Sequence, residues 1–315
     1  MKITILDGYT TNPGDLSFEG FEQFGQVDYY DRTPAELTVQ RAKGAQVVIT
    51  NKTLLGADVL KQLPDCKYIG LLSTGYDVVD LDYTNENGIT VCNIPSYSTE
   101  AVAQSTFAHI LNIANQVKLH SDCVKAGEWA ACNDFCFMKS PLFELQGKTL
   151  GLFGFGRIAK SVANIAKSFG MKVIGYSRSG FEHEFVQSVS LDELFCMSDI
   201  LSLHAPLNPG TNGIICKDNI DKMKDGAVII NTSRGKLINE QHLADALMSG
   251  KIAAAGVDVL STEPPKADNP LVGCKNCYIT PHIAWAATET RGRLVDIAVK
   301  NLEAFLNGNP INTVK

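Results

Sequence analysis

Three side chains suited to acid–base and carboxylate chemistry follow apolar runs in the last third of the chain: Arg234, Glu263 and His282. A guanidinium binds a carboxylate through two parallel hydrogen bonds. An imidazole exchanges protons near neutral pH, and a carboxylate that hydrogen-bonds its second nitrogen raises its pKa. Together these groups could bind a 2-oxo acid through Arg234 and exchange a proton with its carbonyl oxygen through His282, supported by Glu263. Taken singly, each also suits a surface ion pair, a structural histidine or a turn.

A glycine-rich turn lies upstream, in Thr149-Leu-Gly-Leu-Phe-Gly-Phe-Gly-Arg-Ile-Ala159. It stands between an apolar run and a segment with helical spacing that stops at Gly170, after which a second apolar run begins. Gly154 allows a tight turn, and Gly156 lets the backbone approach a pyrophosphate at the amino-terminal end of the helix. The pattern predicts a dinucleotide site. A glycine turn without a ligand is the alternative.

Two series of apolar runs predict two domains, as the length of 315 residues does. The first series is 3–6, 47–50, 68–72 and 90–93, and the second is 148–153, 172–177, 200–204, 226–231, 254–259 and 277–280. Helical segments such as 57–62, 190–197 and 240–249 separate them. This rhythm predicts an α/β fold with doubly wound parallel sheets, whose carboxyl strand ends border the ligand crevice. One long apolar helix is expected over 98–126 and another after Trp285.

Composition narrows the classes of function. A net charge of −6, from 28 basic and 34 acidic residues, argues against nucleic-acid binding. No apolar run reaches the roughly 20 residues that span a bilayer, and the amino terminus lacks a targeting pattern. Nine scattered cysteines indicate reduced thiols and a cytoplasmic protein, and Cys274 and Cys277 are interpreted as ordinary thiols. No metal site is expected.

The motifs closely resemble those of the D-isomer-specific 2-hydroxyacid dehydrogenase family over nearly the whole chain. They are the glycine turn, Asn231-Thr-Ser-Arg-Gly235, Gly256-Val-Asp-Val259 with the following Glu263-Pro, and Pro281-His-Ile-Ala-Trp285. The resemblance implies a catalytic Arg234, a supporting Glu263 and an acid–base His282. It also implies a discontinuous substrate domain, 1–99 plus 286–315, with the dinucleotide-binding domain, 100–285, inserted in it.

The resemblance further implies where ligands bind. Backbone N–H groups near Thr74 and Gly75 would hold the substrate carboxylate together with Arg234 and His282, and Asp258 would lie near the nicotinamide amide. The residues expected to contact the cofactor are Thr106, Gly154, Gly156, Arg157, Ile158, Ser177, Arg178, Ser179, Ala205, Pro206, Thr211, Thr232, Ser233, Asp258 and Ala284.

Within the family, Asp7-Gly-Tyr-Thr-Thr-Asn-Pro-Gly-Asp15 and Val102-Ala-Gln-Ser105 are most similar to the glycerate dehydrogenase/hydroxypyruvate reductase branch. The expected reaction is reduction of hydroxypyruvate or glyoxylate to D-glycerate or glycolate. A phosphoglycerate enzyme ranks lower, because residues 73–77 hold no cation. A D-lactate dehydrogenase-type enzyme, a nucleotide-sensing corepressor-like binding protein and a structural protein with an empty cleft remain alternatives.

The second strand of the nucleotide unit departs from the usual pattern. A carboxylate that would bind both ribose hydroxyls is replaced by Ser177, with Arg178 beside it. A 2′-phosphate then meets no like charge and can pair with Arg178. The sequence therefore favours NADP(H) over NAD(H), although a solvated Arg178 with bound NAD(H) is the alternative. The apolar positions of 102–113 and Trp129 favour a homodimer and equally suit an intrachain core.

Overall fold

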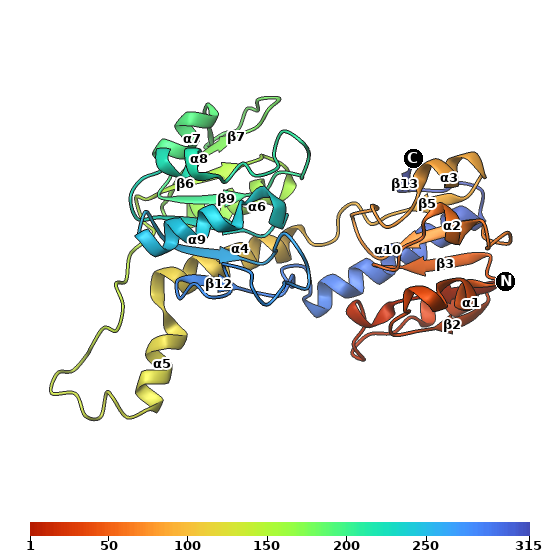
Figure 1. The fold of residues 1–315 in the computed structure, drawn as a ribbon, viewed down its shortest axis with the longest axis horizontal. Helices are drawn as coiled ribbons and strands as arrows, with labels where there is room; N and C mark the ends of the chain where they lie inside the picture. The colour runs from red at the N-terminus through yellow and green to blue at the C-terminus, as the bar shows by residue number, and fades with distance from the viewer. The chain divides into compact units, whose positions relative to one another are not determined.

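The computed structural model describes all 315 residues, and the chain divides into two compact units. Unit 1 comprises residues 1–98 and 285–315, and unit 2 comprises residues 99–284. Each boundary lies one residue before the expected one. Unit 2 is inserted in the sequence of unit 1, and each unit has its own largely parallel sheet (Figure 1). This confirms the predicted α/β class with two Rossmann-like domains.

Unit 1 holds a six-stranded sheet in the order β13-β5-β4-β3-β1-β2, parallel except for β13. Its strands are β1 Lys2–Ile5, β2 Gln26–Tyr29, β3 Val47–Thr50, β4 Tyr68–Leu71, β5 Thr90–Cys92 and β13 Thr313–Val314. The helix α10 (Thr288–Leu306) packs on one face, and α1 (Thr38–Ala42), α2 (Ala57–Leu60) and α3 (Leu81–Glu86) cover the other. Strands buried on both faces explain the continuous apolar runs.

Unit 2 holds a seven-stranded parallel sheet in the order β12-β11-β10-β9-β6-β7-β8. Its strands are β6 Thr149–Phe153, β7 Lys172–Tyr176, β8 Gln187–Ser188, β9 Ile200–Leu203, β10 Ala227–Asn231, β11 Ile252–Val257 and β12 Cys277–Ile279. One face is covered by α4 (Thr99–Asn115) and α6 (Arg157–Ser168). The other carries α7 (Leu191–Met197), α8 (Lys217–Lys222) and α9 (Glu240–Ser249). The order reverses between β6 and β9, which defines a ligand-binding switch point.

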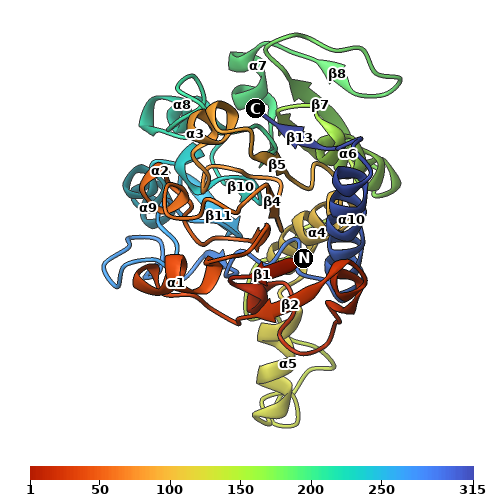
Figure 2. The same cartoon turned by 90° about the vertical axis from the view of Figure 1, so that its right-hand side faces the viewer.

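The expected single helix over 98–126 is wrong. It is two helices, α4 and α5 (Val117–Lys125), because Gln116 between them is left-handed, with φ 47°. The Gln116 side chain donates to the Tyr278 hydroxyl at 2.5 Å, a tertiary contact that helical periodicity does not reveal. In Figures 1 and 2, α5 and the chain after it form an arm that projects from the rest of unit 2.

Three short strands, β2, β8 and β13, were not among the expected runs. Each lies at the edge of its sheet. An edge strand has fewer neighbours to pack against, so its residues need not form an apolar run. The remaining short helices are of the 3-10 type: η1 Gly8–Thr10, η2 Glu19–Phe24, η3 Ala35–Leu37 and η4 Gly235–Leu237. None of the helices has the length and apolar character needed to cross a bilayer.

Candidate active site

The glycine turn follows β6 at the switch point of unit 2. Gly154 has φ 90°, a conformation that favours glycine. A Cβ on Gly154 would also lie 2.7 Å from the backbone nitrogen of Ala205, in the segment that follows β9. The turn therefore needs glycine for two reasons, and it brings Gly154 against the backbone of His204 and Ala205.

The first turn of α6 has no capping side chain. Gly156 is its N-cap and supplies no side-chain hydrogen bond, so the amides of the first turn have no capping group. A Cβ on Gly156 would meet no protein atom within 4 Å, so packing within the protein does not require glycine there. Ala159 is fully buried against the sheet. An uncapped helix start with free space at Gly156 fits a pyrophosphate.

The segment after β7 forms a tight turn. The Gly180 amide donates to the Ser177 carbonyl at 2.9 Å, and the Ser177 and Ser179 hydroxyl oxygens are 3.3 Å apart. Arg178 is exposed and forms neither a hydrogen bond nor an ion pair. The Phe181 ring stacks on Phe155 of the glycine turn, with centroids 3.8 Å apart. This stacking fixes the two turns to each other.

The residues of the predicted acid–base group follow three neighbouring strands. Arg234 follows β10, Glu263 follows β11 and His282 follows β12, and these strands are adjacent in the sheet. A Glu263 carboxylate oxygen lies 2.6 Å from Nδ1 of His282, the contact that the sequence predicts. Both side chains are about one-third exposed, and Nε2 of His282 has no protein partner. The carboxylate sets Nδ1 as the protonated donor and leaves Nε2 for a ligand.

Arg234 is exposed in the loop after β10. Its guanidinium donates to the Ser233 carbonyl at 2.8 Å and pairs with no carboxylate. Asn231 Nδ2 donates to the Arg234 carbonyl at 2.9 Å, which fixes the backbone of this loop. Gly235 packs so tightly against the Leu260 backbone that a Cβ would overlap it. This close approach joins the Arg234 loop to the loop that carries Glu263.

Asp258 is buried, with 1% of its surface exposed, and its carboxylate fixes the turn around His282. It accepts hydrogen bonds from the amides of Ile283 at 2.9 Å and Ala284 at 2.8 Å. The His282 amide donates to the Asp258 carbonyl at 2.8 Å. His282 has φ 55°, which is uncommon outside glycine, so the surrounding bonds must hold this conformation.

Several predicted cofactor residues use their hydroxyls within unit 2. The Thr106 and Thr232 oxygens are 3.0 Å apart, and both residues are buried. Ser233 Oγ donates to the Ala205 carbonyl at 2.8 Å, and Thr211 Oγ1 donates to the Pro206 carbonyl at 2.7 Å. The Ser233 bond joins the loops after β9 and β10, the Thr232 contact ties the second of these loops to α4, and the Thr211 bond closes the first loop on itself.

Thr74 and Gly75 lie in unit 1, after β4. The Thr74 hydroxyl donates to the Ile94 carbonyl at 2.6 Å, and Asn93 Nδ2 donates to the Thr74 carbonyl at 2.8 Å. The amides of Thr74 and Gly75 donate to no acceptor in the protein. Two fixed, unused donors in a row are suited to an anion.

Sequence reasoning missed two histidines of unit 2, the buried His109 and the partly buried His204. His109 contacts Thr280, and His204 lies 2.9 Å from the Ser202 hydroxyl at the end of β9. Burial lowers the pKa of His204 to about 4. Lone histidines within apolar segments carry no signal that separates them from ordinary core positions.

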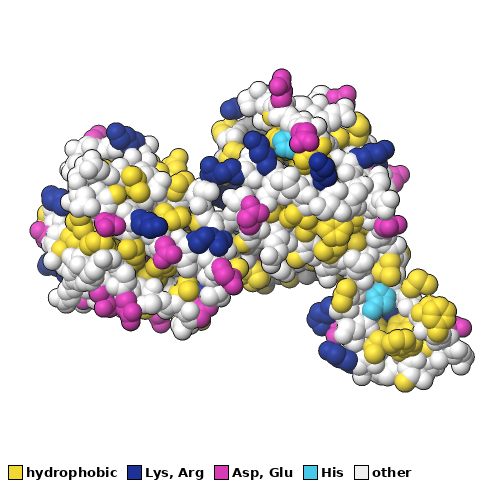
Figure 3. Space-filling view, turned by 180° about the vertical axis from the view of Figure 1, so that it is seen from behind, with side chains coloured by type: hydrophobic (Ala, Val, Ile, Leu, Met, Phe, Trp, Pro, Cys, Tyr) yellow, Lys and Arg dark blue, Asp and Glu magenta, His cyan; other side chains and the backbone are white.

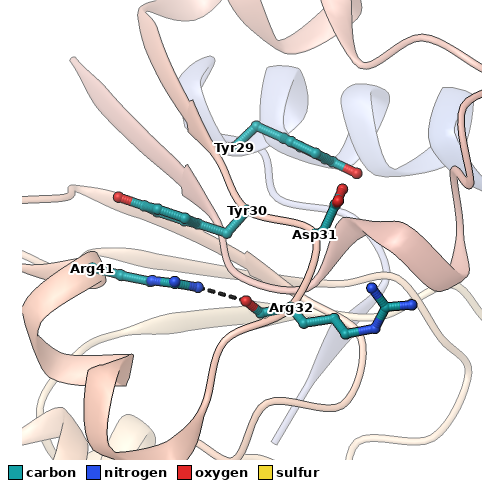
Figure 4. Close-up of a pocket in the computed structure, with 5 residues that line it drawn as sticks. All are labelled: Tyr29, Tyr30, Asp31, Arg32 and Arg41. Carbon is teal, nitrogen blue, oxygen red and sulfur yellow. Dashed lines mark hydrogen bonds between the residues drawn. The ribbon is translucent and has the colours of Figure 1, made fainter.

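Other features of the molecule involve none of the predicted site residues. A cavity of about 400 Å³ in unit 1 is lined by Tyr29, Tyr30, Asp31, Arg32 and Arg41, none of them a predicted site residue (Figure 4). Burial raises the pKa of the Cys277 thiol to about 12. No group of three or more His, Cys, Asp or Glu side chains is arranged to hold a metal ion.

Comparisons with known proteins identify the family of the chain. Residues 107–284 match the NAD-binding domain model of D-isomer-specific 2-hydroxyacid dehydrogenases. The hydroxypyruvate reductase of Blautia hydrogenotrophica is 50% identical, with 100% of this chain and 99% of that protein aligned. An acyclic imino acid reductase (Bsp5) solved with NADPH and D-Arg is 31% identical, with TM-score 0.85 over both full chains. The D-lactate dehydrogenase of Aquifex aeolicus, solved with NAD and lactic acid, is 31% identical, with TM-score 0.83 over both full chains. The chain belongs to the D-isomer-specific 2-hydroxyacid dehydrogenase family.

Proposed function

We propose that the protein is a nicotinamide-dependent reductase that converts hydroxypyruvate to D-glycerate and glyoxylate to glycolate. The observation that carries the proposal is the 2.6 Å contact between Glu263 and His282, beside the strand end that bears Arg234. The full-length relative from Blautia, whose name states hydroxypyruvate reductase, supports the choice of substrate.

The three side chains have distinct roles in this proposal. A reduced nicotinamide, when bound, would supply the hydride for C2 of the 2-oxo acid. Nε2–H of His282 gives a proton to the carbonyl oxygen, which completes the hydroxyl group. Glu263 accepts from Nδ1–H and stabilises the imidazolium form before the transfer. Arg234, with no carboxylate partner in the protein, binds the substrate carboxylate and polarises the carbonyl.

The chain's own groups fit a dinucleotide. Gly154, Gly156, Arg157 and Ile158 would hold the pyrophosphate at the uncapped start of α6. The loops that carry Ala205, Thr232 and Asp258 would hold the nicotinamide half. The unused amides of Thr74 and Gly75 are assigned to the substrate carboxylate.

We assign NADP(H) as the preferred cofactor. The support is the Ser177–Gly180 turn, which offers two neighbouring hydroxyls and the unpaired guanidinium of Arg178 and contains no carboxylate. Stacking of Phe181 on Phe155 holds this turn in place before a nucleotide binds. A 2′-phosphate would gain charge-assisted hydrogen bonds at such a turn.

The assay that tests the function follows loss of reduced-cofactor absorbance with a panel of 2-oxo acids. Hydroxypyruvate, glyoxylate, pyruvate and 3-phosphohydroxypyruvate are each tested with NADPH and NADH. We expect the highest kcat/KM for hydroxypyruvate with NADPH. Turnover restricted to pyruvate would support a D-lactate dehydrogenase, as the Aquifex structure suggests. Cofactor binding without turnover on any acid would support a nucleotide-sensing protein instead.

A homodimer is part of the proposal. The arm of α5 and residues 126–143 exposes large apolar side chains, among them Trp129 (50% exposed), Phe135 (89%) and Met138 (72%). Figure 3 shows hydrophobic side chains, in yellow, on the outside of this arm. Exposed apolar surface of this kind is typical of a subunit contact, which sedimentation of wild type and of Phe135→Ser would test.

A further inference from the structure

A chain of polar side chains leads from helix α4 to the turn that carries His282. His109 Nε2 lies 3.1 Å from Thr280 Oγ1, and Thr280 Oγ1 lies 2.6 Å from a carboxylate oxygen of Asp258. His109 is 6% exposed and Asp258 is 1% exposed. Buried polar groups in such a chain strengthen one another when all are satisfied. Asp258 fixes the turn around His282, whereas His109 has no part in the proposed acid–base group.

The hydrogen positions along this chain follow from the partners. Both carboxylate oxygens of Asp258 face backbone N–H donors, so Asp258 accepts and the Thr280 hydroxyl donates its one hydrogen to it. The hydroxyl oxygen can then only accept from His109, which must carry its hydrogen on Nε2. Burial lowers the pKa of His109 and keeps the ring neutral, so Nδ1 has no hydrogen. The direction of every bond is thereby fixed.

The ring of His109 is also fixed sterically. A Cβ on Gly256 in β11 would lie 2.7 Å from the His109 Cβ and 2.9 Å from its Nδ1. The absence of a side chain at Gly256 therefore makes the space that the imidazole fills. Glycine inside a buried strand often marks such a close approach.

We propose that His109 is a positioning residue for His282. Its Nε2–H orients the Thr280 hydroxyl toward Asp258, and Asp258 holds the left-handed turn through the amides of Ile283 and Ala284. The effect on turnover rests on the proposed function. The effect on the turn does not, because the bonds exist in the protein without a ligand.

The test compares His109→Leu with His109→Gln, whose amide nitrogen is the same number of bonds from the backbone as Nε2. Phe107→Leu, at a buried position on the same helix, is the packing control. Hydrogen exchange at the Ile283 and Ala284 amides is measured first, because it needs no activity. The kcat for hydroxypyruvate and the dissociation constant of NADPH are measured next.

We expect His109→Leu to speed exchange at both amides about 10-fold and to lower kcat about 10-fold, as loss of one buried hydrogen bond implies. NADPH binding should weaken less than kcat falls, because only the nicotinamide half is assigned to this turn, and His109→Gln should restore most of the exchange protection and of kcat. Thr280→Val should match His109→Leu, and the double variant should be no worse than either single one. Wild-type exchange in His109→Leu would overturn the proposal, as would equal losses in Phe107→Leu or no rescue by glutamine. Accelerated exchange in a protein that reduces no 2-oxo acid would overturn the proposed function alone.

Discussion

The two sheets use their switch points differently. In unit 1 the strand order reverses between β1 and β3, and the Asp7 carboxylate fills that position. It accepts hydrogen bonds from the amides of Asn51 at 2.7 Å, Lys52 at 2.6 Å and Thr53 at 2.8 Å. In unit 2 the order reverses between β6 and β9, and the first turn of α6 has no capping side chain.

The two sheets share a type of topology but differ in what binds at the switch point. Both switch points present backbone N–H groups to an anion, but unit 1 supplies the anion from its own chain. Unit 2 has glycine at the corresponding turn and leaves its donors to a ligand. Arg234 and His282, whose side chains keep unused hydrogen-bonding capacity, also belong to unit 2. A doubly wound sheet is therefore insufficient to assign nucleotide binding, and the side chain at the switch point decides.

The largest expected effect comes from removing Arg234, a cation of unit 2 that pairs with no carboxylate of the protein. Arg234→Ala should lower kcat/KM for hydroxypyruvate about 1,000-fold, because the carboxylate clamp and the polarising donor are both lost. Lys236→Ala, which removes an exposed cation two residues away, is the matched control and should change kcat/KM less than about threefold. Steady-state kinetics with saturating NADPH measures both. Similar losses in the two variants would assign the effect to general surface charge.

The next largest effect is on stability and concerns Asp7, which occupies the switch point of unit 1. Asp7→Ala should lower the free energy of unfolding by about 3 kcal/mol, because three backbone amides lose a charged partner. Hydrogen exchange should rise in β3 and β4 of unit 1 while the NADPH dissociation constant stays constant. Asp65→Ala removes an exposed carboxylate of the same unit and serves as the control. Weakened NADPH binding in Asp7→Ala would contradict the claim that Asp7 stabilises unit 1 and takes no part in cofactor binding.

Acid should destabilise the two units in different pH ranges. The pKa of His204 in unit 2 is lowered by burial to about 4, so the unfolded state binds the extra proton first. The stability that neutral His204 provides is present above about pH 6.5 and is lost by about pH 4, up to about 3 kcal/mol.

In unit 1, hydrogen bonding to Arg291 lowers the pKa of Asp15 to about 2. Its contribution is present above about pH 4 and is lost only as the pH falls toward 2. Hydrogen exchange is followed separately in peptides from β6 of unit 2 and β4 of unit 1. As the pH falls, exchange in unit 2 should therefore accelerate at a higher pH than exchange in unit 1. His204→Gln should remove this difference between pH 6.5 and 4. Loosening of unit 1 before unit 2 would contradict the assignment.

The smallest effect is on the choice between NADPH and NADH and concerns the turn after β7. Ser177→Asp combined with Arg178→Gln should shift the ratio of kcat/KM for NADPH over NADH about 10-fold toward NADH, because a carboxylate repels a 2′-phosphate and accepts from ribose hydroxyls. Ser179→Ala is the milder companion variant. Unchanged KM values for both cofactors would count against Arg178 as the selecting residue.

Much of the fold follows from local patterns. The bounds of α9 coincide with the predicted 240–249, and its Asn239 cap and Gly250 stop are residues with known preferences there. The contact between Glu263 and His282 could be predicted because their strands are neighbours in a doubly wound sheet. The break at Gln116 could not, because it depends on Tyr278 more than 160 residues away in the sequence. The role of His109 could not be predicted either, because tertiary packing alone brings it to Thr280, which directly follows β12.

The central claim is that His282, held by Glu263, transfers the proton that accompanies hydride transfer. The most direct test is single-turnover reduction of hydroxypyruvate by NADPH-loaded wild type and His282→Gln, with NADPH binding measured in parallel. We predict that the variant binds NADPH as wild type does and reacts about 1,000-fold more slowly. A single-turnover rate within a few-fold of wild type would contradict the account.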